Sequence, residues 1–366
     1  MKNNDLHFFE HRNDISPNLL HDKFKTLRNE PLLHLERDII NEWANGFADR
    51  DGKLVKEFQT TFHSSLWEIY LFAVLKELEL KVDFSKNRPD FIVFGEVEFY
   101  IEAVVSEIKK GGRSELARNE KDVFSMLEPL HRDQKFYHII DEAITRHSNS
   151  ILSKHKKYIN EYAKCDWVKE NAPFVVALGS YDQVNYGREF HYSMMALLYG
   201  FRFNLDGQVY IRENSIIKPE TVSEIPIGIF SDASYEEISA IVFSCTVSMG
   251  KLTSLAISKN PCHPTNFVLN IRHDMDPPNY KIQVVSQEVP EELTDGLFVF
   301  HNPHAKNPLP RSIFDGSNAI QVSVKDKGIE FSGESLPLVA RFNNLKMYFP
   351  GDFMDLLITE TFENYN

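Results

Sequence analysis

One segment limits the possible folds more than any other: residues 61–80 show a helix pattern that is apolar on nearly every side. Its apolar members are Phe62, Leu66, Trp67, Ile69, Tyr70, Leu71, Phe72, Ala73, Val74 and Leu75. A helix without a polar face has to be covered all round, so we expect this one to be largely buried. The rest of the chain must therefore supply a core that encloses it.

Strand and helix patterns alternate after this segment. We expect strands at residues 81–85, 90–94 and 99–105, a long helix at about 131–162, and a further strand at 174–178. The order is then helix, three strands, helix and strand. This order predicts an α/β (α+β) core in which helices pack on a mixed sheet.

Two regions flank this core, which we place at residues 58–200. Residues 1–57 carry apolar residues at helical spacing and are expected to form a helical N-terminal extension. Residues 201–366 consist of short β-branched and aromatic runs separated by Asn, Pro, Gly and Asp, so a β-rich C-terminal half is expected. It either extends the first sheet or forms a domain of its own. A chain of 366 residues is long enough for either arrangement.

The charge balance limits the partners. The chain has 40 Lys and Arg against 53 Asp and Glu, a formal charge of -13. This charge argues against indiscriminate binding to nucleic acid or to an anionic membrane, but it leaves room for a local basic groove. The longest apolar run, residues 69–75, is far shorter than the ~18 residues of a membrane span, and the N-terminus has no apolar signal core. We therefore expect a soluble, cytoplasmic protein with no membrane partner.

Cysteine and histidine give no sign of a metal site. Cys165, Cys245 and Cys262 are far apart and include no C-x-x-C pair, which argues against a disulfide framework and against a cysteine-rich zinc site. The 14 histidines show no recognised ligand spacing, so we assign none of them to a metal.

Glu68 is the strongest single indication of a functional site. It is the only Asp, Glu, Lys or Arg between Thr61 and Leu75, inside the apolar helix. An unpaired buried carboxylate costs several kcal/mol unless it is protonated, paired or bound to a cation. Glu68 therefore either lies at an exposed edge or pairs with an arginine, or it belongs to a site.

Two more acids lie on the expected hairpin of residues 90–105. If its turn has three residues centred on Glu96, antiparallel pairing sets Asp90 opposite Glu102 on one face of the sheet. Like charges with Cβ atoms about 5 Å apart repel each other, and a divalent cation with a preference for oxygen, Mg²⁺ or Mn²⁺, would turn that repulsion into binding. A register shifted by one residue would instead send the two acids to opposite faces.

Glu68 on a helix, Pro89-Asp90 at the start of a strand and Glu102 on the next strand resemble the PD-(D/E)XK nuclease superfamily over residues 58–182. The resemblance implies a restriction-endonuclease-like mixed sheet flanked by helices, and metal-dependent hydrolysis of phosphodiester bonds. It implies that Asp90, Glu102 and the backbone carbonyl of Ala103 hold Mg²⁺ or Mn²⁺. Glu68 would add a ligand or orient the attacking water.

One position departs from this family. Its members usually carry a lysine two residues after the second acid, where this chain has Val104. Lys154 is the candidate replacement, because it lies in the apolar stripe of the long helix and can reach the carboxylates unless it extends to water. Residues 146–157 contain no acid, and Arg146 and Lys157 are expected to grip phosphates unless this is simply a solvated charged face.

The sequence thus predicts a metal-dependent nuclease that acts on DNA or another nucleic acid, with roles in restriction, repair or phage defence that the resemblance alone suggests. The alternative is a catalytically inactive relative that binds nucleic acid or protein. Val104 and the acidic charge favour the alternative. A protein partner or a second copy of the chain is compatible with both.

Overall fold

The computed structural model describes residues 6–108, 111–119, 121–122, 129–185, 187–260, 263, 266–275, 278–325, 328–345 and 359. Its main feature is an eight-stranded mixed sheet with the order β1-β2-β3-β4-β9-β12-β13-β14. The strands are β1 (Lys81–Asp83), β2 (Phe91–Phe94), β3 (Glu98–Val105), β4 (Phe174–Gly179), β9 (Ala240–Ser244), β12 (Phe298–His301), β13 (Ile320–Lys325) and β14 (Gly328–Ser332). Strands β3, β4 and β9 run parallel in its centre, whereas β1, β2 and β3 pair antiparallel.

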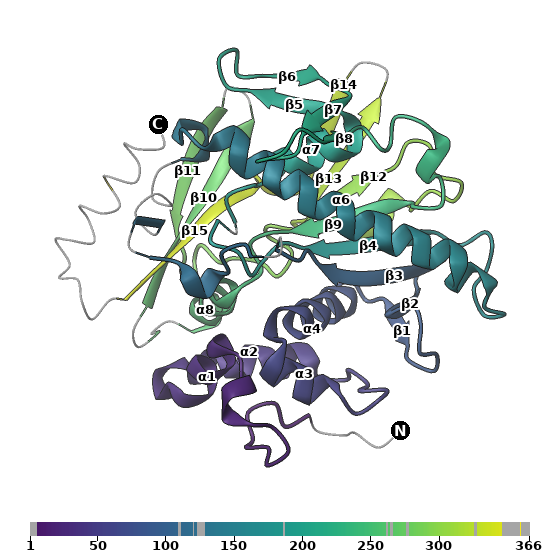
Figure 1. Cartoon of the computed structure of the whole chain (residues 1–366). Helices are drawn as coiled ribbons and strands as arrows, with labels where there is room; N and C mark the ends of the chain where they lie inside the picture. The colour runs from purple at the N-terminus through teal and green to yellow at the C-terminus, as the bar shows by residue number, and fades with distance from the viewer. Residues whose placement is uncertain are drawn as a thin grey trace.

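Helices cover both faces of this sheet (Figure 1). One face carries α2 (His34–Ala44), α3 (Leu54–Thr60), α4 (Phe62–Glu77) and α8 (Met249–Lys259), and the other carries α6 (Phe136–Asn160) and α7 (Tyr192–Tyr199). Alternation along β3 produces the two faces, because Ile101 packs in the core around α4 and Tyr100 packs in the core around α6. The chain is therefore a mixed α/β protein, as its pattern predicts.

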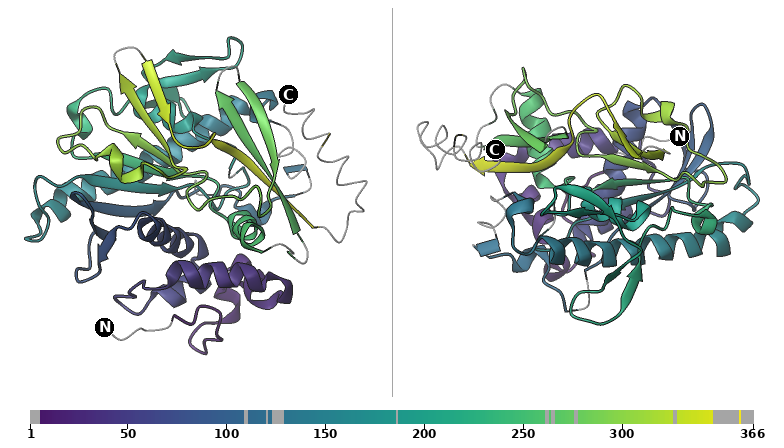
Figure 2. Two further views of the ribbon diagram at one scale, coloured as in Figure 1. Left: turned by 180° about the vertical axis from the view of Figure 1, so that it is seen from behind. Right: turned by 90° about the horizontal axis from the view of Figure 1, so that it is seen from above.

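The apolar helix of the sequence is α4, and it is enclosed as expected. Twelve of its 16 residues are buried. The indole Nε1 of Trp67 donates a hydrogen bond to the carbonyl of Ala177 in β4 (3.0 Å), and the Tyr70 hydroxyl donates to the carbonyl of Leu293 (2.9 Å). The N-terminal extension, with α1 (Asp22–Asn29), α2 and α3, covers the side of α4 that the sheet leaves open (Figure 2).

The C-terminal half extends the first sheet, because β9, β12, β13 and β14 all belong to it. It also forms a three-stranded sheet of β10 (Asn266–Met275), β11 (Pro278–Val284) and β15 (Leu338–Leu345), and the pairs β5 (Phe201–Asn204) with β6 (Val209–Arg212) and β7 (Ser215–Ile217) with β8 (Glu224–Pro226). Within the described residues, no helix has the length and apolar character that a membrane crossing requires.

A buried charged network joins the three-stranded sheet to α8. The carboxylate of Glu291 binds the ammonium of Lys251 in α8 (2.7 Å) and the guanidinium of Arg341 in β15. Arg272 of β10 pairs with Asp295 at 2.7 Å. Each of these charges has a partner of opposite sign, which is the condition for burying them.

Strand β9 lies in the centre of the eight-stranded sheet, and a substitution there tests whether the strand is buried. Ile241 is 0% exposed there, whereas Ile217 of β7 is 52% exposed. Replacing Ile241 with alanine should lower the free energy of unfolding by about 2–5 kcal/mol, because it leaves a cavity between the sheet and its helices. The matched variant Ile217→Ala should change it by less than ~1 kcal/mol. Urea unfolding of both variants measures the difference, and equal losses would contradict the burial of β9.

Candidate active site

The hairpin of β2 and β3 has the register that places its acids opposite each other. Phe91 pairs with Ile101 and Phe94 pairs with Glu98, so one step further Asp90 stands opposite Glu102. The turn is centred on Glu96, as predicted, and the register shifted by one residue is wrong. Asp90 and Glu102 share the face that carries α6, because Ile92 and Tyr100 belong to the core on that side.

A backbone contact holds Asp90 in place. Its Oδ2 atom accepts a hydrogen bond from the amide N–H of Ala103 (2.8 Å). On the loop before Asp90, the guanidinium of Arg50 donates to the carbonyl of Lys86 (2.5 Å) and, at 3.4 Å, to that of Pro89. Arg50 belongs to the N-terminal extension, so that extension also supports the position of Asp90.

Glu102 is almost fully buried and meets two ammonium groups from α6. Its side chain is 1% exposed, and its Oε1 atom lies 2.8 Å from Nζ of Lys154 and 3.0 Å from Nζ of Lys157. The two lysines are three residues apart and so stand on one side of the helix. Lys154 therefore faces the carboxylates and does not extend to water. Lys157 also contacts Glu102 in this arrangement.

Val104 lies two residues after Glu102 on β3. Its side chain packs with the core on the α6 face, the same face as Glu102. A lysine at position 104 would point toward α6, and Lys154 reaches the same face from the opposite direction. The structure thus brings an ammonium group from α6, and not from β3, to Glu102.

Glu68 is coupled electrostatically to these acids. Burial raises the pKa of Glu68 to about 8, with a further contribution from the charge of Asp90. Burial, and then the charge of Glu102, raises the pKa of Asp90 to about 6. Both shifts mean that this poorly solvated place favours the neutral, protonated form of each carboxyl. Nearby Tyr162, which sequence reasoning missed, has its pKa raised by burial and by the Glu102 charge.

The three carboxylates are not drawn tightly together. Among the residues that the structure describes, His21, His63 and Glu115 are the group of three whose metal-binding atoms all lie within 4.8 Å of one another. The oxygens of Glu68, Asp90 and Glu102 are spaced more widely. Asp90 and Glu102 stand opposite each other on neighbouring strands, whereas Glu68 lies on α4, which covers the other face of the sheet.

A polar pocket of about 600 Å³ lies between the end of β3 and one side of α6. It is lined by Val104 and Val105 and, on α6, by Arg146, Asn149, Ser150, Ser153 and Lys154. A second pocket of about 420 Å³ shares Ile108 and Glu142 with it and continues along the helix toward Lys135. The two pockets together form a groove along α6 that Lys154 lines at one end, and we call it the α6 groove.

Arg146 lines this groove but uses its guanidinium inside the protein. The side chain is 6% exposed, and it donates to the hydroxyls of Ser106 (2.8 Å) and Ser180 (3.1 Å) and lies 3.5 Å from Glu189. Ser106 and Ser180 follow β3 and β4 directly. Arg146 therefore anchors α6 to the ends of two strands, a role different from the phosphate contact expected from sequence.

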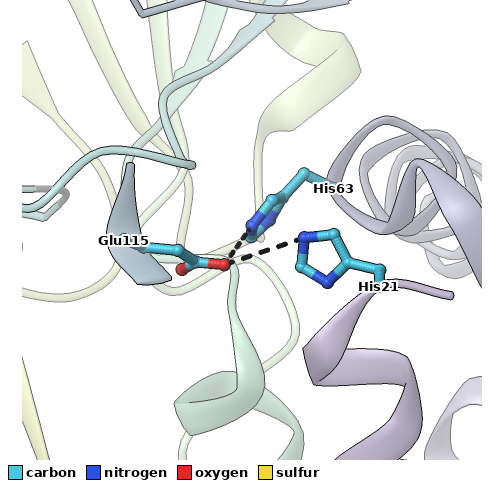
Figure 3. A group of neighbouring side chains, drawn as sticks. All are labelled: His21, His63 and Glu115. Carbon is cyan, nitrogen blue, oxygen red and sulfur yellow. Dashed lines mark hydrogen bonds and ion pairs between the residues drawn. The ribbon is translucent and has the colours of Figure 1, made fainter. Parts of the chain in front are cut away.

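A second polar cluster lies on the α4 side of the molecule (Figure 3). His63, in the first turn of α4, places Nε2 2.7 Å from Oε1 of Glu115, and Nε2 of His21 lies 4.0 Å from the same oxygen. The ammonium of Lys23 lies 2.6 Å from the other oxygen of Glu115. Sequence reasoning assigned no histidine to a metal, because these ligands come from three distant segments and no spacing motif connects them.

The raised pKa of Glu68 predicts a dependence of stability on pH. A carboxyl whose folded pKa is about 8, against 4.5 when unperturbed, binds a proton more tightly in the folded chain, so stability falls as pH rises from about 4.5 to about 8. Glu68→Gln removes this loss. Without divalent cations, the variant should gain roughly 1–3 kcal/mol relative to wild type between pH 5 and pH 9.

Urea unfolding across this pH range checks the prediction. The exposed residue Glu334 provides the control, and Glu334→Gln should follow wild type at every pH. A Glu68→Gln curve parallel to that of wild type would show that Glu68 titrates as an ordinary carboxyl.

The structure and its sequence were compared with known proteins. No family model, no curated protein and no solved structure in these comparisons matches the chain. The function proposed below is therefore inferred from the arrangement of the chain's own side chains.

Proposed function

We propose that this chain is a metal-dependent nuclease with a PD-(D/E)XK-like, restriction-endonuclease-like core, acting on DNA or another nucleic acid in the cytoplasm. The observation that supports it most is the facing pair Asp90 and Glu102 with the ammonium of Lys154 2.8 Å from Glu102. Two acids on neighbouring strands and one lysine on the same face are the groups that this chemistry needs. A part in restriction, repair or phage defence belongs to the same proposal.

The donor set suits Mg²⁺ or Mn²⁺. Asp90, Glu102 and the Ala103 carbonyl offer oxygen atoms only, which is the preference of these ions. The Oε2 atom of Glu102 is buried and has no hydrogen-bond partner among the described residues. The raised pKa of Asp90 reflects burial and repulsion by Glu102, and a cation would relieve that repulsion. We therefore assign the ion to Asp90, Glu102 and the carbonyl of Ala103.

The reaction would be hydrolysis of a phosphodiester. The oxygen of a water molecule forms a bond to phosphorus and the water gives up a proton to the solvent. The bond from phosphorus to the departing oxygen breaks, and the departing oxygen takes up a proton. A bound divalent ion would supply charge stabilisation and a water of lowered pKa. Glu68 would orient the water through its carboxyl, and Lys154 would stabilise the negative charge that develops on the phosphate. Lys157 stands beside Lys154 and would bind a flanking phosphate oxygen.

The α6 groove gives the substrate a place next to these groups. It begins at Val104 and Lys154 and continues along α6 past Arg146 to Lys135, with Arg113 and Lys218 also on its walls. Lys154, Lys135, Arg113 and Lys218 are the cations of this groove; Arg146, bonded inside the protein, does not add to them, and Glu107 and Glu142 also line it. The whole chain carries a formal charge of -13. Binding that depends on a metal ion and a few cations is expected to be weak without the metal and sensitive to salt.

A second candidate is a catalytically inactive relative that binds nucleic acid or a protein. The specific observation in its favour is that both Lys154 and Lys157 contact Glu102, so two ammonium groups already neutralise one of the proposed metal ligands. In such a protein the lysines would have replaced the metal ion. The two candidates differ in whether a metal binds at Asp90 and Glu102.

Nuclease assays test the first candidate. Plasmid DNA, single-stranded DNA and RNA are each incubated with the protein and Mg²⁺ or Mn²⁺. We expect cleavage of at least one substrate that chelation abolishes, and a rate lower by roughly 100-fold or more in Asp90→Asn and in Glu102→Gln, because each loses a charged ligand.

Glu98→Gln is the matched control, since Glu98 lies on the same strand and bonds Lys169 and Tyr100 instead of the cluster. No cleavage of any substrate by wild type, or equal cleavage by wild type and both acid variants, would exclude the enzyme. Calorimetry with Mn²⁺ then separates the candidates, because the inactive relative should bind no ion at Asp90 and Glu102.

The lysine on α6 makes a separate prediction. Lys154→Met should lower the rate of cleavage by about 10²–10³-fold at saturating substrate, because it removes one group that stabilises the transition state. Lys156→Met is the control, as Lys156 is an exposed neighbour on the same helix. Equal rates for both variants and wild type would show that Lys154 only balances the charge of Glu102.

A further inference from the structure

The cluster of His21, His63 and Glu115 is built from three parts of the chain that meet near the start of α4 (Figure 3). His21 is the residue just before α1, His63 lies in the first turn of α4, and Glu115 begins the short helix Glu115–Ala117 that follows β3. His63 and Glu115 are buried. The proposed nuclease site uses none of these residues.

The ligand atoms have the chemistry and spacing of a transition-metal site. Two imidazole nitrogens and one carboxylate oxygen are a frequent ligand set for Zn²⁺, with a fourth position left to water. Ligand atoms around a tetrahedral zinc ion stand roughly 3.3 Å apart, as follows from bonds of about 2.05 Å. The distances of 2.7 and 4.0 Å from Glu115 Oε1 to the two Nε2 atoms lie on either side of that value. Movements of less than 1 Å would therefore bring both of these distances to that value.

Metal binding would keep the contact of Lys23 with Glu115 and would replace the hydrogen bond between Nε2 of His63 and Oε1 of Glu115 (2.7 Å). Lys23 holds Oε2 of Glu115, which leaves Oε1 for the ion, and hydrogen-bonded carboxylate ligands of this kind are common in metal sites. The Nδ1 atom of His21 accepts a hydrogen bond from the backbone N–H of Lys23 (3.2 Å), which caps α1. A neutral ring that binds metal through Nε2 carries its proton on Nδ1, so metal binding must outweigh the loss of that cap.

We infer that Nε2 of His21, Nε2 of His63 and Oε1 of Glu115 form a site for one Zn²⁺ ion. The ion would tie the N-terminal extension and the start of α4 to the segment that follows β3. Because α4 also carries Glu68, and β3 carries Glu102, this site would hold in place two elements that carry acids of the proposed nuclease site. The ion would be additional to the proposed metal at Asp90 and Glu102, and its fourth position would be open to water.

The test uses the full chain after treatment with a chelator, followed by titration with Zn²⁺ in a calorimeter and with Co²⁺ by visible absorption. We expect one tight ion per chain and the absorption bands of tetrahedral Co²⁺. His21→Asn and His63→Gln should each weaken Zn²⁺ binding at least tenfold. Asparagine is a good helix cap and glutamine can still donate to Glu115, so both variants should fold.

Three controls make the result decisive. His11→Asn changes an exposed histidine outside the cluster and should bind Zn²⁺ like wild type. The double variant Asp90→Asn, Glu102→Gln should also bind it like wild type, which separates this site from the proposed nuclease metal. Lys23→Met removes a positive charge beside Glu115 and should tighten binding.

Several outcomes would overturn the inference. The first is no Zn²⁺ binding by wild type, and the second is unchanged binding by His21→Asn and His63→Gln. Binding that appears only in Lys23→Met would also overturn it, because the ammonium of Lys23 would then be the natural cation at Glu115.

Discussion

The enclosure of α4 is the constraint on which the rest of the structure depends. A helix that is apolar on nearly every side needs apolar neighbours on every side. The sheet covers one side, through contacts such as the hydrogen bond from Trp67 to Ala177, and the N-terminal extension and α8 cover the others. The extension is therefore a required part of the core, since without it α4 would expose apolar surface to water.

This enclosure also determines the environment of Glu68, the one acid in the apolar part of α4. The helix can hold a carboxyl only where its surroundings compensate the charge, and the pKa near 8 shows that the protein alone compensates it poorly. Asp90 and Glu102 add like charge nearby, although each has its own contact, Asp90 with the Ala103 amide and Glu102 with two lysines. The raised pKa values of Glu68 and Asp90 therefore reflect surroundings that disfavour charge, and carboxyls perturbed in this way are typical of functional sites.

The sequence predicts local features of this fold well. The apolar runs and the short turn at Glu96 determine the register of Asp90 and Glu102, because a shift by one residue would bury the wrong side of each strand. The direction in which Lys154 points is predicted from its place in the apolar stripe of α6. These predictions succeed because they depend on residues close together in the chain or on one helix.

Features that depend on distant segments are not predictable in this way. The pairing of β12 between β9 and β13, which makes the C-terminal half extend the first sheet, depends on contacts across the whole chain. The cluster at Glu115 draws on residues from three segments. The role of Arg146 depends on Ser106 and Ser180, which meet only when β3 and β4 pair. In each case the sequence contains the residues but gives no local pattern that connects them.

The position of Lys154 on α6, and not on β3, has a physical consequence. In a strand, a lysine two residues after Glu102 would be held in position by the same sheet that holds the acid. Lys154 instead depends on how α6 lies against the sheet. Arg146, about two helical turns earlier, binds Ser106 and Ser180 at the ends of β3 and β4 and thereby fixes the helix to the strand that carries Glu102. The buried arginine thus does for Lys154 what the strand backbone would do for a lysine at position 104.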